Sequence, residues 1–279
     1  MQSVCACIVT YNPEIALKSL VESLLLDFGS VCIVDNGSRV DLLGIVNIGL
    51  DGVHIIRLDA NLGVAAGLNE AVQKAKALGF EWVCCFDQDS DYVEGSMSEY
   101  IRASLGQRDR VVGSGYEYPA AVKFSCSASS QSKSLFIPVR TVITSGSFFS
   151  VSLWELVGGF DDDLFIDSVD HDFCLKTYAA GGDVVRLKRN TIRHKVGFGQ
   201  SFLGVPLHSP LRKYYIFRNV ILMVKRHGLR FPYWSAKQIA RLVFEFASLL
   251  CFEGEKTEKL KLATKGAWHG VKGVKGKYV

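Results

Sequence analysis

Residues 82–90 read Trp82-Val83-Cys84-Cys85-Phe86-Asp87-Gln88-Asp89-Ser90. The apolar run that ends at Phe86 predicts a short strand buried on both faces, as in a parallel sheet. Asp87 and Asp89 follow one residue apart, and in an extended chain they point the same way. Two carboxylates at a sheet edge suit a hard divalent cation such as Mg²⁺ or Mn²⁺, which would neutralise a diphosphate. The structural alternative is a strand-ending turn, because such turns are also rich in Asp and Ser.

The residues before this stretch alternate between predicted strands and predicted helices. Apolar, β-prone runs predict strands at 4–10, 30–34 and 53–58, and helical periodicity predicts amphipathic helices at 14–26 and 64–78. This order indicates an α/β fold with a Rossmann-like, mostly parallel sheet flanked by helices.

Polar clusters follow three of these strands. They are Thr10-Tyr11-Asn12, Asp35-Asn36 and Asp87-Gln88-Asp89. Because the carboxyl ends of parallel strands meet at one edge of a sheet, we expect a ligand site there. No Gly-x-Gly-x-x-Gly sequence follows the first strand and no Gly-Lys-Ser loop occurs, so dinucleotide-binding and P-loop sites are disfavoured.

The second half of the chain predicts further strands and helices. We expect a helix at 96–105, a strand at 111–116, a mobile surface loop at 120–133, strands within 139–150, a helix at 172–180, a strand at 184–187, and helices at 210–224 and 235–252. Asp170 would stand at the N-terminal end of the helix at 172–180. Because Asp is a common helix cap, one of Asp170 and Asp172 is expected to be an N-cap.

The chain has 279 residues, which permits one large domain or one domain with an appendage. We place a catalytic domain at 1–208 and a helical, basic extension at 209–279. No signal peptide is recognisable, and no apolar run reaches the ~18 residues that span a bilayer. The eight cysteines lie mostly in apolar runs without zinc-site spacing, which predicts reduced thiols in a cytoplasmic protein.

Charge is distributed unevenly along the chain. Residues 212–279 carry 15 Lys and Arg against 4 Asp and Glu, a net +11, and the rest carries 17 against 24, a net −7. The aromatic run at 231–234 favours a membrane interface, so we expect peripheral contact between the basic extension and an anionic membrane. A solvated basic face is the structural alternative. A nucleic-acid partner is disfavoured, because the basic excess is local and no base-reading motif occurs.

Six short motifs follow one another along the chain: Val9-Thr10-Tyr11-Asn12, Val34-Asp35-Asn36-Gly37-Ser38, Asn61-x-Gly63, Asp87-Gln88-Asp89, Gly158-Gly159-Phe160-Asp161 and Asp170-x-Asp172. Their order resembles family 2 inverting glycosyltransferases of the GT-A fold. The forms at 86–90, 164–167 (Leu-Phe-Ile-Asp) and 214–219 (Tyr-Tyr-x-x-Arg-Asn) are similar to those of bacterial rhamnosyltransferases in that family.

The resemblance implies a nucleotide-sugar donor pocket in the first ninety residues. The residues that would line it are Thr10, Tyr11, Asn12, Asn61 and Gly63. Asp35 would accept a hydrogen bond from the ring N–H of the base, and Asp87 would face the ribose. Asp89 would hold Mg²⁺ or Mn²⁺ on the diphosphate, with Asp87 and His194 as further candidate metal ligands, although a lone His is more often structural.

The resemblance also implies that Asp170 is the catalytic base. The family pattern is Glu-Asp-x-Asp followed later by Arg, whereas this chain has Val169 and Lys176 at those two places. The first difference leaves the role of base to Asp170. The second keeps a positive charge but loses the planar fork of an arginine.

The implied function is transfer of a sugar, L-rhamnose from dTDP-L-rhamnose, to a hydroxyl group. The acceptor would be a growing cell-surface polysaccharide or a glycan linked to polyprenyl diphosphate, at the inner face of the plasma membrane. One alternative is a sugar-nucleotide nucleotidyltransferase, which would usually carry a Gly-rich, basic loop after the first strand. Another is a non-catalytic binding module that works through the basic extension. The sequence leaves open the sugar, the linkage and the oligomeric state.

Overall fold

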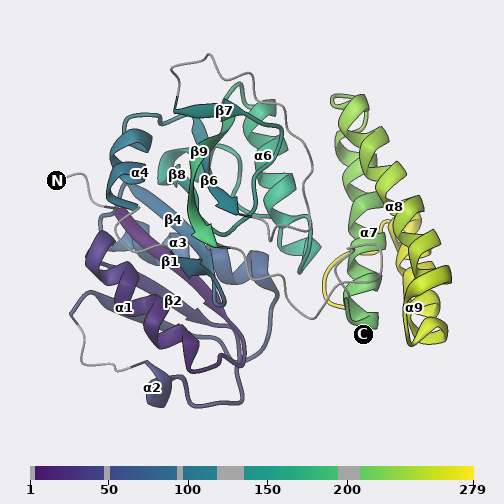
Figure 1. Cartoon of the computed structure of the whole chain (residues 1–279), viewed down its shortest axis with the longest axis horizontal. Coiled ribbons are helices and arrows are strands. Elements are labelled where there is room, and N and C mark those ends of the chain that lie inside the picture. Colours follow the sequence, from purple (N-terminus) through teal and green to yellow (C-terminus); the bar gives the residue numbers. More distant parts are fainter. Residues whose placement is uncertain (1–3, 47–50, 93–96, 118–134, 194–207) are drawn as a thin grey trace.

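The computed structural model describes residues 4–46, 51–92, 97–117, 135–193 and 208–279 (Figure 1). At its centre is a mixed sheet with the strand order β3-β2-β1-β4-β8-β6-β9-β5, and β7 pairs with β9. The strands are β1 (Val4–Thr10), β2 (Val31–Asp35), β3 (Val53–Arg57), β4 (Trp82–Asp87), β5 (Asp91–Tyr92), β6 (Arg110–Glu117), β7 (Phe136–Pro138), β8 (Ser147–Ser150) and β9 (Asp183–Arg193). Strands β3, β2, β1 and β4 run parallel, as the sequence predicts.

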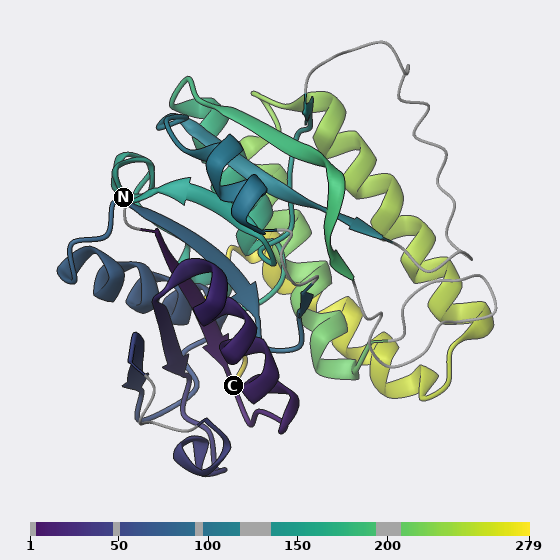
Figure 2. The same ribbon diagram turned by 60° about the vertical axis from the view of Figure 1, so that its left-hand side comes forward.

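Helices cover both faces of this sheet (Figure 2). They are α1 (Ala16–Phe28), α2 (Leu42–Ile45), α3 (Val64–Ala77), α4 (Met97–Ser104), α5 (Val151–Leu156) and α6 (Val169–Ala179). Along β1, Cys5 and Cys7 belong to the same core cluster as side chains of α3 and α6, whereas Ala6 and Ile8 pack with α1. This alternation follows from the period of two in a strand and gives the body two apolar layers.

Three further helices form a bundle beside the body (Figure 1). They are α7 (Pro210–His227), α8 (Pro232–Phe252) and α9 (Lys256–Lys272). Helices α7 and α9 approach each other closely at Gly266. A Cβ atom added there would lie 2.2 Å from the carbonyl oxygen of Tyr214, so only glycine fits. Among the helices in the described ranges, none is long and apolar enough to cross a membrane.

Three sequence-based expectations about the fold need correction. Of the strands expected within 139–150, a single one forms in this described stretch, β8, because the chain turns at Gly146, whose φ of 74° is left-handed. The helix expected at 172–180 begins already at Val169. Within the helical extension expected at 209–279, the sequence predicts no separate helix at 256–272, where α9 lies. Its two internal glycines lower helix propensity, but they permit the packing against α7 that stabilises the helix.

Two other expectations meet the limits of the described ranges. The loop expected at 120–133 lies outside them, as does Cys126. The remaining seven cysteines are free thiols, as predicted. Cys5 Sγ and Cys32 Sγ lie 3.4 Å apart, much farther than the roughly 2.05 Å of a disulfide bond.

Candidate active site

The predicted polar clusters meet at one edge of the sheet. In the register of the parallel strands, Thr10 pairs with Asp35 and Val9 pairs with Asp87. The ends of β1, β2 and β4 therefore bring Tyr11, Asn36 and Asp89 to the same side of the molecule. This is the edge at which α/β proteins bind their ligands.

Three carboxylates gather at this edge from two distant parts of the chain. Asp87 ends β4, Asp89 is exposed in the following turn, and Asp170 lies in the first turn of α6. Burial, together with the charges of Asp89 and Asp170, raises the pKa of Asp87 to about 7, against the opposing charge of Arg212. Carboxylates that lie close enough to raise one another's pKa favour a bound cation.

The donor atoms fit a hard divalent cation. Within the described ranges no group of three or more His, Cys, Asp or Glu side chains is arranged to hold a metal ion. Asp87 and Asp89 offer two carboxylates, and Mg²⁺ is typically held by one or two carboxylates together with substrate phosphates and water. His194, the third candidate ligand, lies outside the described residues.

Gln88 ties this turn to the end of β1. Its Oε1 accepts hydrogen bonds from Thr10 Oγ1 at 2.7 Å and from the Tyr11 backbone N–H at 2.8 Å. The sequence placed Gln88 within a motif without giving it a role. In the structure it fixes the relative position of Tyr11 and the two aspartates, while the Tyr11 ring stays 43% exposed at the edge.

Asp35 is completely buried and organises the turn that follows β2. Its Oδ1 accepts a hydrogen bond from the Ser38 backbone N–H at 2.9 Å, and its Oδ2 lies 3.3 Å from Arg57 Nε. Ser38 Oγ in turn accepts from the Asn12 backbone N–H at 2.8 Å. These bonds join the ends of β1 and β2; direct contact between Asp35 and a base stays a prediction.

The loop before α3 is held by asparagines. Asn36 Nδ2 donates to the Gly63 carbonyl at 2.9 Å, and Asn61 Oδ1 accepts from the Gly63 backbone N–H at 3.0 Å. Gly63 has a φ of 96°, and a Cβ atom there would lie 2.6 Å from the carbonyl oxygen of Phe165. Glycine is required here because the segment that leads to Asp170 passes directly over it.

That segment, residues 161–168, is called the base loop below. Three of its non-glycine residues, Phe165, Asp167 and Ser168, have positive φ angles of 63–66°. Such conformations cost of order 1–3 kcal/mol each and persist only where the surroundings enforce them. The loop ends two residues before Asp170, whose Oδ1 accepts from the His171 backbone N–H at 2.8 Å.

The expectation that Asp170 or Asp172 caps α6 is wrong. The N-cap is Ser168, whose own side chain makes no capping hydrogen bond, and the Asp170 carboxylate accepts from the free N–H of His171 inside the first turn. Asp172 is instead completely buried, with its Oδ1 2.8 Å from both Arg226 Nη1 and His227 Nε2. Burial opposes ionisation of Asp172, but His227, Lys176 and Arg226 outweigh it and lower the pKa of this carboxyl.

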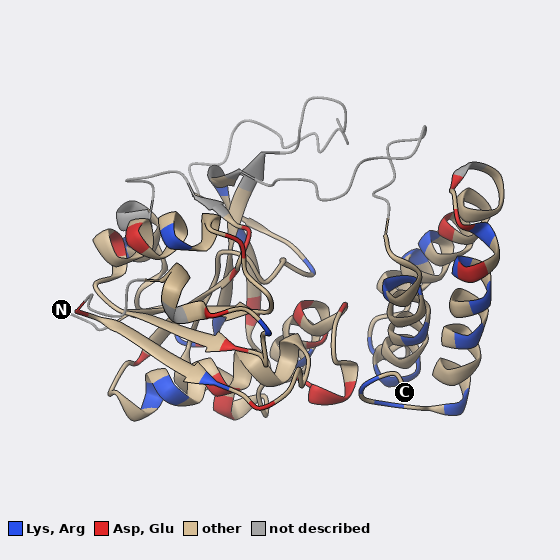
Figure 3. Cartoon of the chain, turned by 90° about the horizontal axis from the view of Figure 1, so that it is seen from below, with Lys and Arg blue, Asp and Glu red and all other residues tan. Residues whose placement is uncertain are grey.

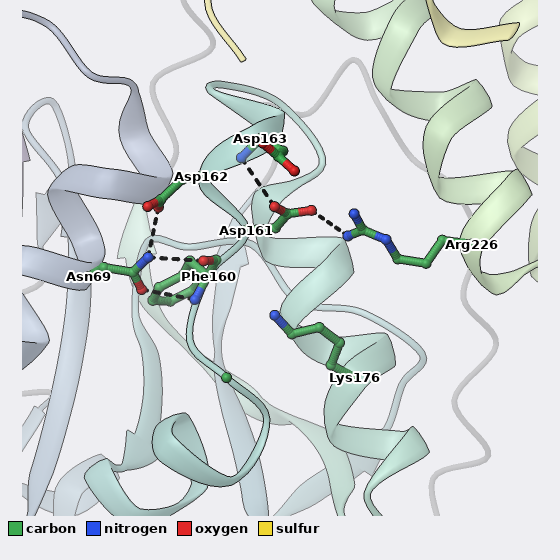
Figure 4. Close-up of a pocket in the computed structure, with 8 residues that line it drawn as sticks. Asn69, Phe160, Asp161, Asp162, Asp163, Lys176 and Arg226 are labelled. Carbon is green, nitrogen blue, oxygen red and sulfur yellow. Dashed lines mark hydrogen bonds and ion pairs between the residues drawn. The ribbon is translucent and has the colours of Figure 1, made fainter. Parts of the chain in front are cut away.

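Lys176, which stands where the family pattern has Arg, faces this buried network. Its Nζ lies 3.4 Å from Asp172 Oδ2 and donates to the carbonyl of Gly159 at 2.5 Å. Figure 4 shows Lys176 and Arg226 on one side of a polar pocket, with Arg226 paired to Asp161. The pocket is lined by Asn69, Gly158, Phe160, Asp161, Asp162, Asp163, Lys176 and Arg226.

Asn69 of α3 explains the Gly-Gly-Phe-Asp motif at 158–161. Its Oδ1 accepts from the Phe160 backbone N–H at 2.9 Å, and its Nδ2 donates to the Phe160 carbonyl at 2.9 Å and to Asp162 Oδ1 at 2.8 Å. A Cβ atom at Gly159 would lie 2.8 Å from Asn69 Oδ1. The motif therefore anchors the start of the base loop to the body (Figure 4).

Arg212 is the residue of the site that sequence reasoning missed. It lies in the first turn of α7, and its guanidinium holds Asp167 of the base loop through contacts of 3.1–3.3 Å. Burial opposes its charge, but Asp167 and, more weakly, Asp87 and Asp89 raise the pKa of Arg212. It lies 40 positions after Asp172, the last residue of the six motifs, so no spacing pattern in the sequence points to it.

Comparison with known proteins identifies the family. Residues 5–155 match Glycosyl transferase family 2. The chain is 25% identical to the dTDP-rhamnosyl transferase RfbF of Shigella flexneri, over 97% of this chain and 96% of that protein. Two solved structures are similar in fold. S. aureus TarS 1-349 in complex with UDP-GlcNAc has a TM-score of 0.65 at 16% identity, over 98% of this chain and 81% of that one.

The second structure is GalNAc-T7 with UDP, GalNAc and Mn²⁺, with a TM-score of 0.57 at 12% identity, over 69% of this chain and 43% of that one. The shared architecture is the GT-A fold that the sequence predicted. Because the family match spans more than half of the chain, this protein belongs to glycosyl transferase family 2 and is a glycosyltransferase.

Proposed function

We propose that this protein transfers L-rhamnose from dTDP-L-rhamnose to a hydroxyl group of a growing glycan, with inversion at the anomeric carbon. The relative RfbF supports the choice of donor. The observation that carries the reaction is the convergence of Asp87, Asp89 and Asp170 at one sheet edge, where their charges act on one another.

Asp170 is the general base in this proposal. It accepts the proton of the acceptor hydroxyl as the oxygen attacks the anomeric carbon from the face opposite the diphosphate. A single displacement of this kind inverts the anomeric centre and needs no covalent intermediate. Asp87 and Asp89 would hold Mg²⁺ or Mn²⁺, which supplies positive charge to the departing diphosphate when bound. The Arg212 guanidinium adds a second positive charge at the same edge.

The nucleotide lies on the other side of the edge in this proposal. Its pocket is built from Thr10, Tyr11, Asn12, Asp35, Asn61 and Gly63, with the exposed Tyr11 ring available for stacking on the base. Asp35 is assigned to the ring N–H of thymine. The tight bonding of the turns at 35–38 and 61–63 supports this assignment, because it presents a pre-organised surface.

A donor screen tests the proposal. Purified protein is incubated with nucleotide sugars and Mg²⁺ or Mn²⁺, and release of nucleoside diphosphate is measured with and without a hydroxyl acceptor. We expect dTDP-L-rhamnose to be consumed fastest, and we expect chelator or Asp89→Ala to abolish turnover. Formation of nucleotide sugar from rhamnose 1-phosphate and dTTP would instead establish the nucleotidyltransferase alternative. Full activity in excess chelator would exclude the metal assignment.

We also propose that the protein works at the cytoplasmic face of a membrane, where a polyprenyl-diphosphate-linked acceptor would lie. The outward face of α8 supports this placement. It carries exposed apolar side chains, with Tyr233 at 78%, Val243 at 64% and Phe244 at 54% exposure, beside the exposed Lys237 and Arg241. An apolar stripe flanked by cations is typical of helices that lie in an anionic membrane surface.

The charge of α8 favours a lipid surface over a second copy of the chain as its partner. The single acidic residue of α8, Glu245, points inward to Lys213. The charged residues on the outward face of this helix are therefore all cations. Two such faces would repel each other, whereas anionic lipid complements them. Trp234, part of the aromatic run that favoured a membrane, is only 8% exposed and packs in the core, so Tyr233 carries that role.

Vesicle co-sedimentation tests the membrane proposal with point variants. Removing residues after Glu253 would also remove α9, and Lys259 of α9 pairs with Glu253, so truncation would perturb the bundle itself. We expect binding to anionic vesicles in low salt, release in high salt, and loss of binding in a Lys237→Glu, Phe244→Asp variant. Lys18→Glu with Lys76→Glu, on the body, is the matched control. Equal loss in the control, or binding indifferent to lipid charge, would refute the proposal.

A further inference from the structure

Two neighbouring polar residues of α7, Arg218 and Asn219, are completely buried between the bundle and the body. Both belong to the Tyr-Tyr-x-x-Arg-Asn sequence at 214–219, which the chemistry above leaves without a role. Burial of an arginine is costly unless every donor is engaged, so the partners of these two side chains define what they do.

The two N–H donors of the Asn219 amide are shared among three carbonyls of the base loop. Its Nδ2 lies 2.9 Å from the Leu164 carbonyl oxygen, 2.6 Å from that of Ile166 and 2.9 Å from that of Asp167. Its Oδ1 accepts from Arg218 Nε at 2.9 Å, which fixes the orientation of the amide. The side chain thus engages backbone carbonyls at the end of the short 3-10 helix Asp162–Leu164 and in the residues that follow it.

Arg218 extends the same contact to a third segment. Its Nη2 donates to the carbonyls of Asp163, at 3.2 Å, and Leu164, at 2.9 Å, while its Nη1 donates to the carbonyl of Gly276. The Gly276 backbone N–H returns a hydrogen bond to the Asp163 carbonyl at 2.7 Å, and Lys275 pairs with the Asp163 side chain at 2.6 Å. Residues 275–276 therefore close over the loop from outside.

The loop held in this way is strained and touches both halves of the site. Its left-handed residues Phe165, Asp167 and Ser168 lie just before Asp170. The Phe165 carbonyl accepts a hydrogen bond from the Val64 backbone N–H at 2.6 Å. Val64 follows Gly63 of the loop before α3, which is part of the proposed nucleotide pocket. Carbonyls of a strained loop keep their positions only while donors hold them.

We infer that Arg218 and Asn219 are positioning residues: they hold the base loop in its strained conformation and thereby set the location of the Asp170 carboxylate. This inference rests on the proposed role of Asp170 as base. It predicts that removing the hydrogen bonds that hold the base loop near Asp167 lowers the rate of the chemical step. The affinity for the nucleotide should be kept, because Asn36 and Asn61 hold the nucleotide site.

The test compares Asn219→Ala and Asn219→Asp with Lys225→Ala. Lys225 lies on the same helix and donates to the Val271 carbonyl of α9, so its loss weakens the bundle without touching the base loop. We expect kcat to fall at least tenfold in Asn219→Ala and further in Asn219→Asp, whose carboxylate would face three carbonyls. The dissociation constant for dTDP should change less than about threefold, and the control should keep kcat.

Rates are measured well below the melting temperature of every variant, so that the unfolded fraction does not contribute. Backbone amide exchange at 163–170 gives a readout independent of the reaction. We expect it to rise at least tenfold in Asn219→Ala and to stay unchanged in Lys225→Ala. Unaltered exchange would overturn the inference whether or not rhamnose is transferred. Equal losses of kcat and dTDP affinity would also overturn it, because they would indicate general support of the pocket.

Discussion

Charged side chains are arranged in opposite ways at the sheet edge and in the α7–α9 bundle. At the edge, Asp87, Asp89 and Asp170 gather like charges, and burial with those neighbours raises the pKa of Asp87. In the bundle, Lys213 is completely buried between Glu245 and Glu253, at 3.2 and 2.7 Å. A cluster of like charges stores unfavourable energy that a ligand can relieve, whereas paired charges serve the fold.

The same contrast revises what the net charges of the two regions mean. Part of the net charge of +11 in residues 212–279 neutralises carboxylates of the acidic body. Three cations of this region form ion pairs with aspartates of the base loop: Arg212 with Asp167, Arg226 with Asp161, and Lys275 with Asp163. Figure 3 marks the positions of acidic and basic residues along the ribbon, with acidic positions on the body and many basic positions on the bundle. The anionic partner that the sequence indicated is therefore partly the protein itself.

The largest expected effect breaks the edge while leaving the fold intact. Asp170→Asn should lower turnover by ~10²–10⁴, the usual contribution of a general base, because the amide cannot accept the proton. The melting temperature and the affinity for dTDP should stay at their wild-type values, since Asn can still accept the hydrogen bond from the His171 N–H. Steady-state kinetics and calorimetry check this. Wild-type turnover would move the role of base to Asp167 or Asp172.

The next effect breaks the bundle while leaving the edge intact. Lys213→Met should destabilise the protein by about 3–5 kcal/mol, because it leaves Glu245 and Glu253 buried without their shared cation. Denaturant unfolding measures the change. Lys76→Met removes a cation from an exposed pair with Glu155 and should cost less than about 1 kcal/mol. Similar losses in the two variants would contradict the contrast drawn here.

Arg212 joins the two regions, and its removal sharpens the comparison. Arg212→Ala should lower kcat about tenfold to a hundredfold, because it removes positive charge near Asp87 and Asp89 and leaves Asp167 without its guanidinium. Arg212→Lys should recover part of the rate, since charge is kept and the two-pronged contact is lost. A rate unchanged in both variants would restrict Arg212 to a structural contact.

Sequence reasoning identified the edge because local patterns encode it. Strand periodicity and polar strand ends placed Thr10, Asp35 and Asp87 together, and the structure agrees. It failed where a role depends on tertiary partners. Asp172 has the local signature of a helix cap, yet its partner His227 is 55 residues away. Residues 275–276 contact Asp163 of the base loop although they follow it by more than 110 positions in the sequence. No spacing rule predicts such a contact.

The smallest expected effect is a pH dependence of stability that arises from Asp172, between the body and the bundle, and from Glu253, inside the bundle. Burial opposes ionisation of Asp172 and Glu253, but their basic partners outweigh it and lower the pKa of each below its ordinary value of 3.8 or 4.5. A carboxyl with a lowered pKa stabilises the fold above its unfolded pKa, and this contribution is lost as pH falls through the folded pKa. Stability should therefore decline below about pH 4.5, by at most about 1.4 kcal/mol per pH unit for each such group.

Burial raises the pKa of Asp167 against the opposing effect of Arg212, so this residue acts in the reverse sense and offsets part of the decline. Urea unfolding of the wild type and of Asp172→Asn between pH 7 and pH 3 isolates the contribution of Asp172. The variant should be less stable at pH 7, because the buried contacts of Asp172 with Arg226 and His227 are weakened, and should show a shallower slope in acid. Parallel curves for the two proteins would mean that Asp172 does not couple the bundle to the body through its charge.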